Sequence, residues 1–317
     1  MGRHTKIVIA LGGNALQTSK TRPTAEEQLA VVRKTADILA DIKCTFGFEM
    51  CVTHGNGPQV GGILLASETA ENVVPVFPLD VCSAMSQGYI GYHLQQGLSH
   101  ALARRNRKLP VVTLVTQVVV DPADPAFQNP TKPIGSFYTA EAAQKLMKSK
   151  GYVMKEDAGR GWRRVVASPQ PQRIVEIHAV RTLWNSTIVI SVGGGGIPVI
   201  ERPDGSLVGV PAVIDKDLGA EKLAEDVGAE ILLILTAVDS VFVDFNTPQQ
   251  KRLPHLTVAD CEQYIAQGCF APGSMLPKIQ AAMAFAKTRP DRKAIITSLD
   301  HAVDALIGTS GTLITQS

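Results

Sequence analysis

Six short apolar runs, rich in valine and isoleucine, recur along the chain. Most of them are unbroken rather than alternating with polar residues, which is typical of strands buried on both faces. Segments with helical periodicity separate the runs, and strands that alternate with helices predict a mainly parallel sheet with helices on both sides. The predicted strands are KIVIAL (6–11), EMCVT (49–53), LPVVTLV (109–115), STIVISV (186–192), AEILLIL (229–235) and RKAIIT (292–297).

Two of the intervening segments carry clear helix signals. Residues 23–42 repeat apolar side chains with a helical period from Leu29 to Leu39. Residues 215–228 open with acidic residues and end at Gly228, as expected of a helix. The length of 317 residues and a hydrophobic content of 45% are sufficient for one large α/β domain or two modest ones.

Residues 121–171 interrupt this alternation of strands and helices. Proline, glycine and charged residues are dense in this stretch. We expect a small excursion from the sheet, built as a hairpin with one helix at residues 138–151.

Composition and charge exclude several classes of protein. A formal net charge of +2 argues against a nucleic-acid binder that relies on phosphate attraction. No apolar run approaches the length of a membrane helix, and the one near the N-terminus is too short for a signal peptide. We expect a cytoplasmic protein with reduced thiols, because no C-x-x-C pair occurs among the five cysteines, Cys44, Cys51, Cys82, Cys261 and Cys269.

Three of the predicted strands end in glycine-rich segments. Backbone N–H groups in such a segment can approach an anion closely, and a following helix adds a favourable dipole. A tight turn without a ligand is the alternative reading of any single loop. In the second segment Asn56 or Gly57 is suited to cap a helix, with Pro58 in its first turn. The segments are GGN (12–14), GNG (55–57) and GGGG (193–196).

The glycine spacing does not match the familiar nucleotide motifs. No G-x-x-x-x-G-K-[ST] sequence is present, which excludes a P-loop protein. The third glycine of G-x-G-x-x-G is replaced by Val60 in one segment and by Pro198 in another, so a dinucleotide-binding dehydrogenase is disfavoured. His54 precedes the second segment, and both a ligand contact and a packing role remain open for it.

Three lysines occupy distinctive positions. Lys132 lies between prolines, and Lys216 lies between two aspartates at the entrance to a predicted helix. Lys278 follows Ser274, which can cap a helix, and Pro277, which needs no donor in a first turn. Phosphoryl transfer requires positive charge on the oxygens of the transferred group. Any one of these lysines alone is more typical of an ordinary surface residue than of a catalytic one.

Seven motifs together resemble the motif set of the carbamate kinases, within the amino acid kinase family. They follow one another in the family's order from Ile7 to near the C-terminus, and the second and last are the most specific. The motifs are ALGGNAL (10–16), THGNGPQVG (53–61), NPTKPIG (129–135), SVGGGGIPV (191–199), VIDKDL (213–218), LTAVDSVF (235–242) and FAPGSMLPKIQAA (270–282).

The resemblance implies a fold and an arrangement of domains. It implies a three-layer α/β/α sandwich around a central, mainly parallel sheet, formed by one domain over residues 1–317. Residues 121–171 would form a small protruding subdomain. The N-terminal part would bind the phosphoryl acceptor and residues 212–317 the nucleotide. Members of the family are homodimers.

The resemblance also implies a reaction, the reversible exchange of MgATP and carbamate for MgADP and carbamoyl phosphate, used to make ATP in arginine breakdown. Mg²⁺ would be held mainly by phosphates and water, so no protein metal ligand is expected. Matched residue by residue, the catalytic group would be Lys132, Lys216, Asp217 and Lys278. The substrate would lie against Gly12, Gly13, Asn14, Gly55, Asn56 and Gly57, and the nucleotide against Ala237, Val238, Pro272, Gly273, Ser274 and Met275.

Two rival functions remain open. The chain is also consistent with an amino acid kinase that phosphorylates N-acetylglutamate, aspartate or a nucleoside monophosphate. The other rival is a regulatory protein that binds nucleotide without chemistry, against which the intact lysines argue.

Overall fold

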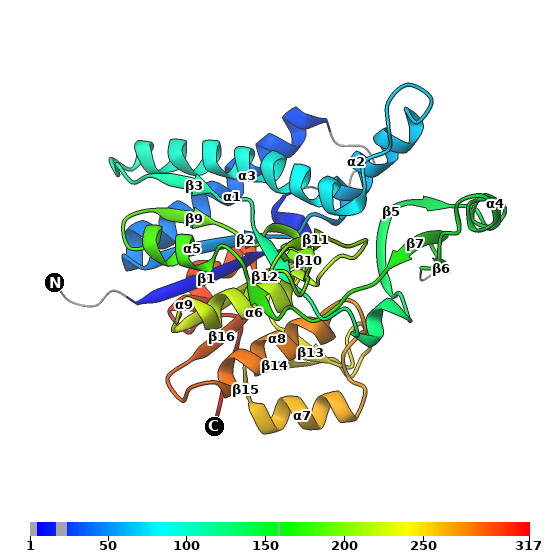
Figure 1. Ribbon diagram of the computed structural model, residues 1–317. Coiled ribbons are helices and arrows are strands. Elements are labelled where there is room, and N and C mark those ends of the chain that lie inside the picture. Colours follow the sequence, from blue (N-terminus) through cyan, green and yellow to red (C-terminus); the bar gives the residue numbers. More distant parts are fainter. Residues whose placement is uncertain (1–4, 17–23, 158) are drawn as a thin grey trace.

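The computed structural model describes residues 5–16, 24–157 and 159–317. A sheet of eight strands forms its centre (Figure 1). Six neighbouring strands are parallel to one another, and the last strand of the chain is antiparallel to its neighbour in that group. The order across the sheet is β15 (His255–Thr257), β17 (Thr312–Thr315), β16 (Lys293–Ser298), β12 (Ile231–Thr236), β1 (Lys6–Leu11), β2 (Glu49–His54), β9 (Ile188–Ile190) and β3 (Val111–Thr113).

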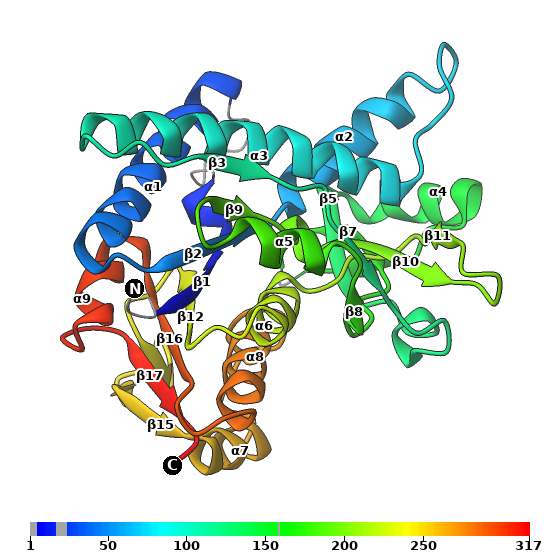
Figure 2. The same ribbon diagram turned by 60° about the vertical axis from the view of Figure 1, so that its left-hand side comes forward.

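Helices cover both faces of this sheet (Figure 2). Successive side chains of a strand point to opposite faces, and in β1 Ile7 and Ile9 join one buried cluster while Val8 and Ala10 join the other. The first cluster includes α1 (Ala25–Phe46), α3 (Leu79–Arg104) and α9 (Ala302–Leu306). The second includes α5 (Ile177–Leu183), α6 (Lys216–Asp226), α7 (Val258–Ala266) and α8 (Met275–Lys287).

The sequence explains where α1 begins and ends. The Thr24 hydroxyl accepts a hydrogen bond from the backbone N–H of Glu27, and the Glu27 carboxylate accepts one from the N–H of Thr24. This capping box satisfies two backbone donors at the helix start. Gly47, with φ 68°, ends the helix in the left-handed conformation that glycine adopts without strain.

Smaller sheets and turns flank the central sheet. A four-stranded sheet has the order β11 (Leu207–Gly209), β10 (Ile197–Glu201), β4 (Gln117–Val119) and β8 (Arg173–Ile174). A two-stranded sheet pairs β13 (Val241–Val243) with β14 (Lys251–Leu253). Single 3₁₀ turns are η1 (Gly13–Ala15), η2 (Pro125–Phe127), η3 (Gly193–Gly195) and η4 (Leu299–His301).

A small subdomain projects from the sandwich beside α2 (Gly57–Thr69) (Figure 1). It contains a three-stranded antiparallel sheet, where the sequence predicts only a hairpin, and one helix at the predicted place. Its elements are β5 (Lys132–Tyr138), α4 (Ala140–Lys150), β6 (Met154–Glu156) and β7 (Trp162–Val166).

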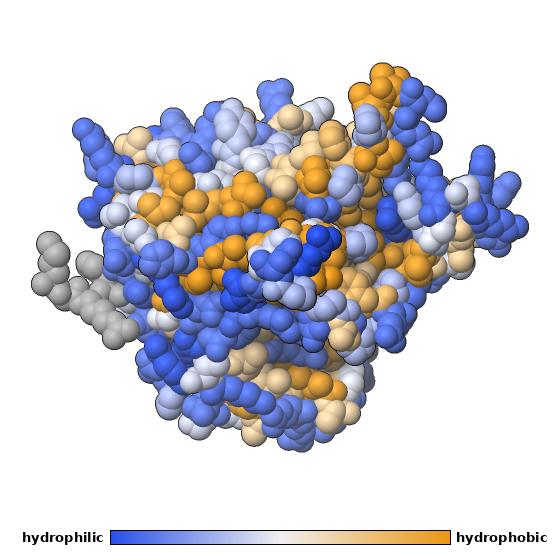
Figure 3. All heavy atoms as spheres, in the orientation of Figure 1, coloured by the Kyte–Doolittle hydropathy of each residue, from blue (hydrophilic) through white to orange (hydrophobic). Residues whose placement is uncertain are grey.

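The loop between α2 and α3 also projects, and it is apolar (Figure 3). Its valine and phenylalanine side chains are exposed, Val73 most of all at 86%. Among the described helices, none is both long enough and apolar enough to cross a membrane.

The predicted fold class is confirmed: a mixed α/β sandwich with a mainly parallel sheet and a small protruding subdomain. All six predicted strands are present. Helix α3 is not marked in the sequence by a clear period, because it contains Gly88, Gly91 and Gly97. Two of these glycines are sites of close packing, since a Cβ on Gly91 would lie 2.2 Å from the Thr113 side chain and one on Gly97 would lie 3.3 Å from Ala36.

Candidate active site

The predicted site residues surround one cavity of about 250 Å³ at the carboxyl edge of the parallel sheet. Loops that follow β1 and β2 line it, together with the first turns of α6 and α8 and the start of β5. Ligands of open α/β sheets bind at this edge. Nine of the predicted residues line the cavity: Gly13, Gly55, Asn56, Gly57, Lys132, Lys216, Asp217, Gly273 and Lys278.

Asp217 holds two of the lysines. Its Oδ1 lies 2.5 Å from Lys216 Nζ and its Oδ2 lies 3.1 Å from Lys278 Nζ. Lys278 also donates to the carbonyl oxygen of Ser274 at 3.1 Å. The Asp217 side chain is only 3% exposed, so the carboxylate fixes two ammonium groups side by side in a nearly dry environment.

Burial and neighbouring charges both shift the pKa values of Asp217 and Lys216. Burial alone would raise the pKa of Asp217, but the ammonium groups of Lys216 and Lys278 hold it below its ordinary value. The pKa of Lys216 is lowered by burial and also by repulsion from Lys278, and the attraction of Asp217 only partly offsets this. Asp217 is therefore a carboxylate at neutral pH, and Lys216 loses its proton more readily than a surface lysine.

The third lysine reaches the cavity from the subdomain. Lys132, the first residue of β5, places its Nζ 2.6 Å from Asp215 Oδ2. The other oxygen of Asp215 accepts the backbone N–H of Asp217 at 2.8 Å and so caps α6. Asp215 therefore links the subdomain to the helix that carries Lys216. The sequence shows it only as an acid beside a lysine, which is a common charge pattern at a helix start.

The first two glycine segments need small residues for close packing. A Cβ on Gly12 would lie 2.6 Å from the carbonyl oxygen of Leu235, and one on Gly55 would lie 3.2 Å from the Lys216 side chain. Asn56 stands at the N-cap position of α2, as predicted, but its side chain does not cap the helix. Its Nδ2 donates instead to Ser86 Oγ at 2.9 Å, which fixes the amide beside the cavity.

His54 has a packing role in this structure. Its ring is 1% exposed and lies against Gly193, where an added Cβ would be 2.4 Å from Nε2. Burial lowers the pKa of His54 to about 4, so the ring is neutral at physiological pH. This supports the packing alternative left open by the sequence.

The third glycine segment has a strained backbone. Val192, fully buried and branched at Cβ, adopts φ 55° and ψ 32°. Such a residue is a genuine outlier in the left-handed region, at a cost of about 1–3 kcal/mol. The following Gly194 also has positive φ, and a Cβ there would lie 2.2 Å from Asn56 Nδ2. After this loop the chain enters β10, not a helix.

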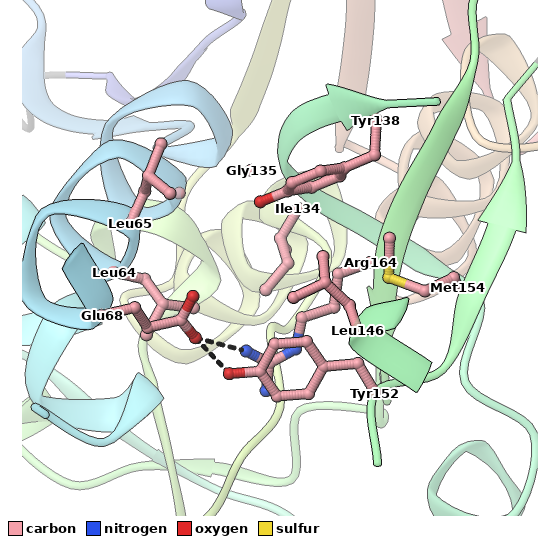
Figure 4. Close-up of a pocket in the computed structure, with 11 residues that line it drawn as sticks. Leu64, Leu65, Glu68, Ile134, Gly135, Tyr138, Leu146, Tyr152, Met154 and Arg164 are labelled. Carbon is pink, nitrogen blue, oxygen red and sulfur yellow. Dashed lines mark hydrogen bonds and ion pairs between the residues drawn. The ribbon is translucent and has the colours of Figure 1, made fainter. Parts of the chain in front are cut away.

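The subdomain rests on α2 through a close contact between two glycines. A Cβ on Gly61, the last glycine of GNGPQVG, would lie 2.3 Å from Gly135 Cα in β5. Further along α2, Glu68 accepts hydrogen bonds from the hydroxyl of Tyr152 and from Arg164 Nη1, the latter at 3.4 Å (Figure 4). Burial and the bond to Glu68 raise the pKa of Tyr152 to about 12, so the phenol remains a donor. A cavity of about 20 Å³ lies beside these side chains, room for a single water.

The remaining predicted residues do not line the cavity. Ala237 and Val238 directly follow β12, at the same edge of the sheet. Ser274 stands at the N-cap of α8, but its hydroxyl makes no capping bond. Asn14 is exposed. The predicted residues outside the lining are Gly12, Asn14, Ala237, Val238, Pro272, Ser274 and Met275.

The polar groups of the cavity that remain available to a ligand are mainly ammonium groups and backbone amides, not carboxylates. Asp215 and Asp217 are both engaged with lysines. Within the described ranges, no group of three or more His, Cys, Asp or Glu side chains is arranged to hold a metal ion. Three lysines and two aspartates give this side of the cavity a formal net charge of +1. Such a site is suited to bind negatively charged phosphate oxygens.

Known proteins resemble this chain over its whole length. The profile of the amino acid kinase family matches residues 5–298. The carbamate kinase of Clostridium perfringens (strain 13 / Type A) is 56% identical over 315 residues, which are 98% of this chain and 100% of the relative. The carbamate kinase of Pyrococcus horikoshii is 51% identical over 313 residues, 98% of this chain and 99% of the relative.

The fold agrees with these relatives. The structure of carbamate kinase from Giardia lamblia bound to AMP-PNP superimposes with a TM-score of 0.91 at 42% identity, over 99% of each chain. Both comparisons bear out the family resemblance carried by the seven motifs. The chain therefore belongs to the amino acid kinase family and, within it, to the carbamate kinases.

Proposed function

We propose that the protein transfers a phosphoryl group reversibly between MgATP and carbamate, giving MgADP and carbamoyl phosphate, and that it serves to make ATP in arginine breakdown. The observation that carries this proposal is the convergence of three lysines and two aspartates, from β5, the start of α6 and α8, on one cavity beside the glycine loops. Relatives 51–56% identical bear the name carbamate kinase.

In the proposed mechanism the transfer is direct and in line. A carbamate oxygen attacks the terminal phosphorus of ATP, the bond from phosphorus to the ADP oxygen breaks, and no proton has to move because carbamate is already an anion. The barrier is the repulsion between two anions, which Lys132, Lys216 and Lys278 reduce. Asp217 pairs with both Lys216 and Lys278, so it would hold the two ammonium groups in place for the phosphoryl oxygens.

The two substrates would occupy opposite sides of the cavity, with the acceptor in the N-terminal part and the nucleotide along residues 212–317. The transferred phosphoryl group would lie against Gly12, Gly13 and Asn14, and carbamate would lie against residues 55–57. The nucleotide would border Ala237, Val238 and residues 272–275. The loops after β1, β2 and β12 lie at one edge of the sheet, which supports a single site that both substrates share.

We propose that Mg²⁺ enters with the nucleotide, held mainly by phosphate oxygens and water. The pairing of both cavity aspartates with lysines supports this arrangement, because neither carboxylate is free. Bound Mg²⁺ neutralises charge on the phosphates.

The size and lining of the cavity favour a small acceptor. N-acetylglutamate, aspartate and nucleoside monophosphates are larger than carbamate and need additional groups for recognition. None of the described residues that line the cavity is an arginine. A volume of about 250 Å³ suits a phosphoryl group and carbamate together.

We also propose that the protein is a cytoplasmic homodimer. On α3, Val81, Met85 and Tyr92 are exposed along one face of the helix, and Val115 is exposed beside the edge strand β3. An apolar stripe next to a sheet edge suits a second copy of the chain. Light scattering at several concentrations, with Tyr92→Glu for comparison, tests this assembly. The five free cysteines suit a reducing compartment.

The test of the function is ATP formation from ADP, Mg²⁺ and carbamoyl phosphate by the purified protein. Lys216→Ala is assayed beside it. ATP from the unaltered protein and not from the variant supports both the reaction and the role of the lysine. A folded protein that binds ADP but makes no ATP points to another acceptor, to be sought among N-acetylglutamate, aspartate and nucleoside monophosphates.

A further inference from the structure

Gln87 of α3 supports the strained glycine loop at residues 192–196 through a hydrogen bond to its backbone. The Gln87 side chain is 1% exposed and makes three hydrogen bonds, all to backbone. Its Nε2 donates to the carbonyl oxygens of Gly193, at 2.9 Å, and Thr116, at 3.1 Å. Its Oε1 accepts the N–H of Thr116 at 2.8 Å. The amide thus ties the loop after β9 to the segment between β3 and β4.

Two threonines complete this support. The Thr53 hydroxyl donates to the carbonyl oxygen of Val192 at 2.8 Å. The Thr116 hydroxyl accepts the N–H of Val192 at 3.1 Å. Both backbone groups of the strained residue are therefore fixed by side chains, and Gln87 fixes the next carbonyl along the chain. A left-handed valine persists only where its surroundings determine it in this way.

The loop that these residues hold has backbone donors to offer. Gly193 and Gly194 are buried, and their N–H groups donate to no acceptor among the described residues. Gly194 lines the active-site cavity. Buried N–H groups without a partner are rare, and consecutive ones in a turn form a concavity suited to an anion.

We propose that Gln87 is a positioning residue for the phosphoryl acceptor. By holding residues 192–194, it keeps the N–H groups of Gly193 and Gly194 in place for the oxygens of carbamate or of the carbamoyl group. This proposal rests on the function proposed above, and it concerns the acceptor side of the cavity alone. The nucleotide side is attached to different elements, α8 and the loop after β12.

The same helix provides a matched control. Gln95 lies two turns further along α3, and its Oε1 accepts the N–H of Thr113 at 3.1 Å. Gln95 therefore also ties α3 to the chain around β3, but among the described residues it makes no hydrogen bond to the glycine loop and does not line the active-site cavity. Gln87→Met and Gln95→Met are the same change of similar volume on one helix, and methionine is a good helix former.

The experiment compares these two variants and Thr53→Val with the unaltered protein. Thr53→Val removes one bond to Val192 without changing the shape of the side chain, and it keeps the test informative if Gln87→Met does not fold. Initial rates of ATP formation give kcat and KM for carbamoyl phosphate, and calorimetry gives the Kd of ADP. Hydrogen exchange over residues 192–197 reports the loop itself, without any need for turnover.

We expect Gln87→Met and Thr53→Val to raise KM for carbamoyl phosphate and to lower kcat/KM by about 10-fold to 100-fold, the range found when supporting residues of a site are removed. ADP affinity should stay within about two-fold, exchange over 192–197 should be faster, and Gln95→Met should show none of these changes. Unchanged exchange in both folded variants would overturn the proposal. An equal loss of affinity for ADP and carbamoyl phosphate would also overturn it. Failure of the unaltered protein to make ATP would contradict the proposed function separately.

Discussion

The contact between Gly61 and Gly135 allows a sharp test of how α2 positions the subdomain. In Gly61→Ala the new Cβ would lie 2.3 Å from Gly135 Cα. Carbon atoms in contact are about 3.5 Å apart or more, so the helix and β5 must separate by about 1 Å. Neither partner is a flexible side chain that can turn away, because the obstructing atoms belong to the backbone.

This displacement would reach the reacting groups. Lys132 lies three residues before Gly135 on the same strand, and residues 56–57 begin the helix that carries Gly61. The separation between Lys132 and the second glycine loop would therefore change by a similar distance. A misplacement of about 1 Å can cost about 100-fold in rate. We expect kcat/KM for carbamoyl phosphate to fall by about that factor, measured as ATP formation in a coupled assay.

The adjacent residue supplies the control. Gly62 is exposed on the same helix, and a Cβ there would meet nothing within 4 Å. Gly62→Ala should keep full activity and should stabilise the helix by about 0.5–1 kcal/mol, because alanine loses less conformational entropy than glycine. If Gly61→Ala were as active as Gly62→Ala, within about three-fold, the glycine contact would not set the position of Lys132.

Three further predictions concern the charged residues. Lys216→Ala should lower kcat by about 10²–10³, the scale for one electrostatic stabiliser, and a rate within a few-fold of the unaltered protein would remove Lys216 from catalysis. Asp217→Asn should lower the free energy of unfolding by about 3–5 kcal/mol, because Lys216 and Lys278 lose their buried carboxylate partner. Urea denaturation would measure this loss, and an unchanged midpoint would contradict it. The rate should fall as pH rises through the pKa of Lys216, which burial lowers from the ordinary lysine value of 10.5. The contribution of Lys216 to the free energy of unfolding should rise over the same pH range, because the native lysine binds fewer protons than the unfolded one. A rate that is constant up to pH 10.5 would refute the assignment.

The sequence predicted the central sheet well because its strands are unbroken apolar runs. Burial on both faces requires such runs, and their short length and their valine and isoleucine content mark them as strands. The four-stranded sheet was not predicted, since β4 and β11 have three residues each and carry no period of their own. Helix α3 was missed because its glycines, which suggest loops, are required by close packing against Thr113 and α1.

The sequence predicted the site residues that belong to recognisable motifs. It missed those whose role depends on contacts between distant parts of the chain. The lysines stand out through their neighbours in the sequence. Asp215 resembles any acid at a helix start, and its pairing with Lys132 joins residues 83 positions apart. Gln87 and Thr116 lie outside the seven motifs, and their hydrogen bonds to the glycine loop depend on how α3 crosses the sheet.

The position of β1 has a consequence for synthesis of the chain on the ribosome. One edge of β1 pairs with β2, which follows soon after, but the other pairs with β12, where Ile7 meets Ile231. At about 5–20 residues per second, the 224 residues between such partners take roughly 10–45 s to make. Throughout that time the nascent chain carries a strand that is apolar from Ile7 to Leu11 and has one unpaired edge, the kind of surface that chaperones cover.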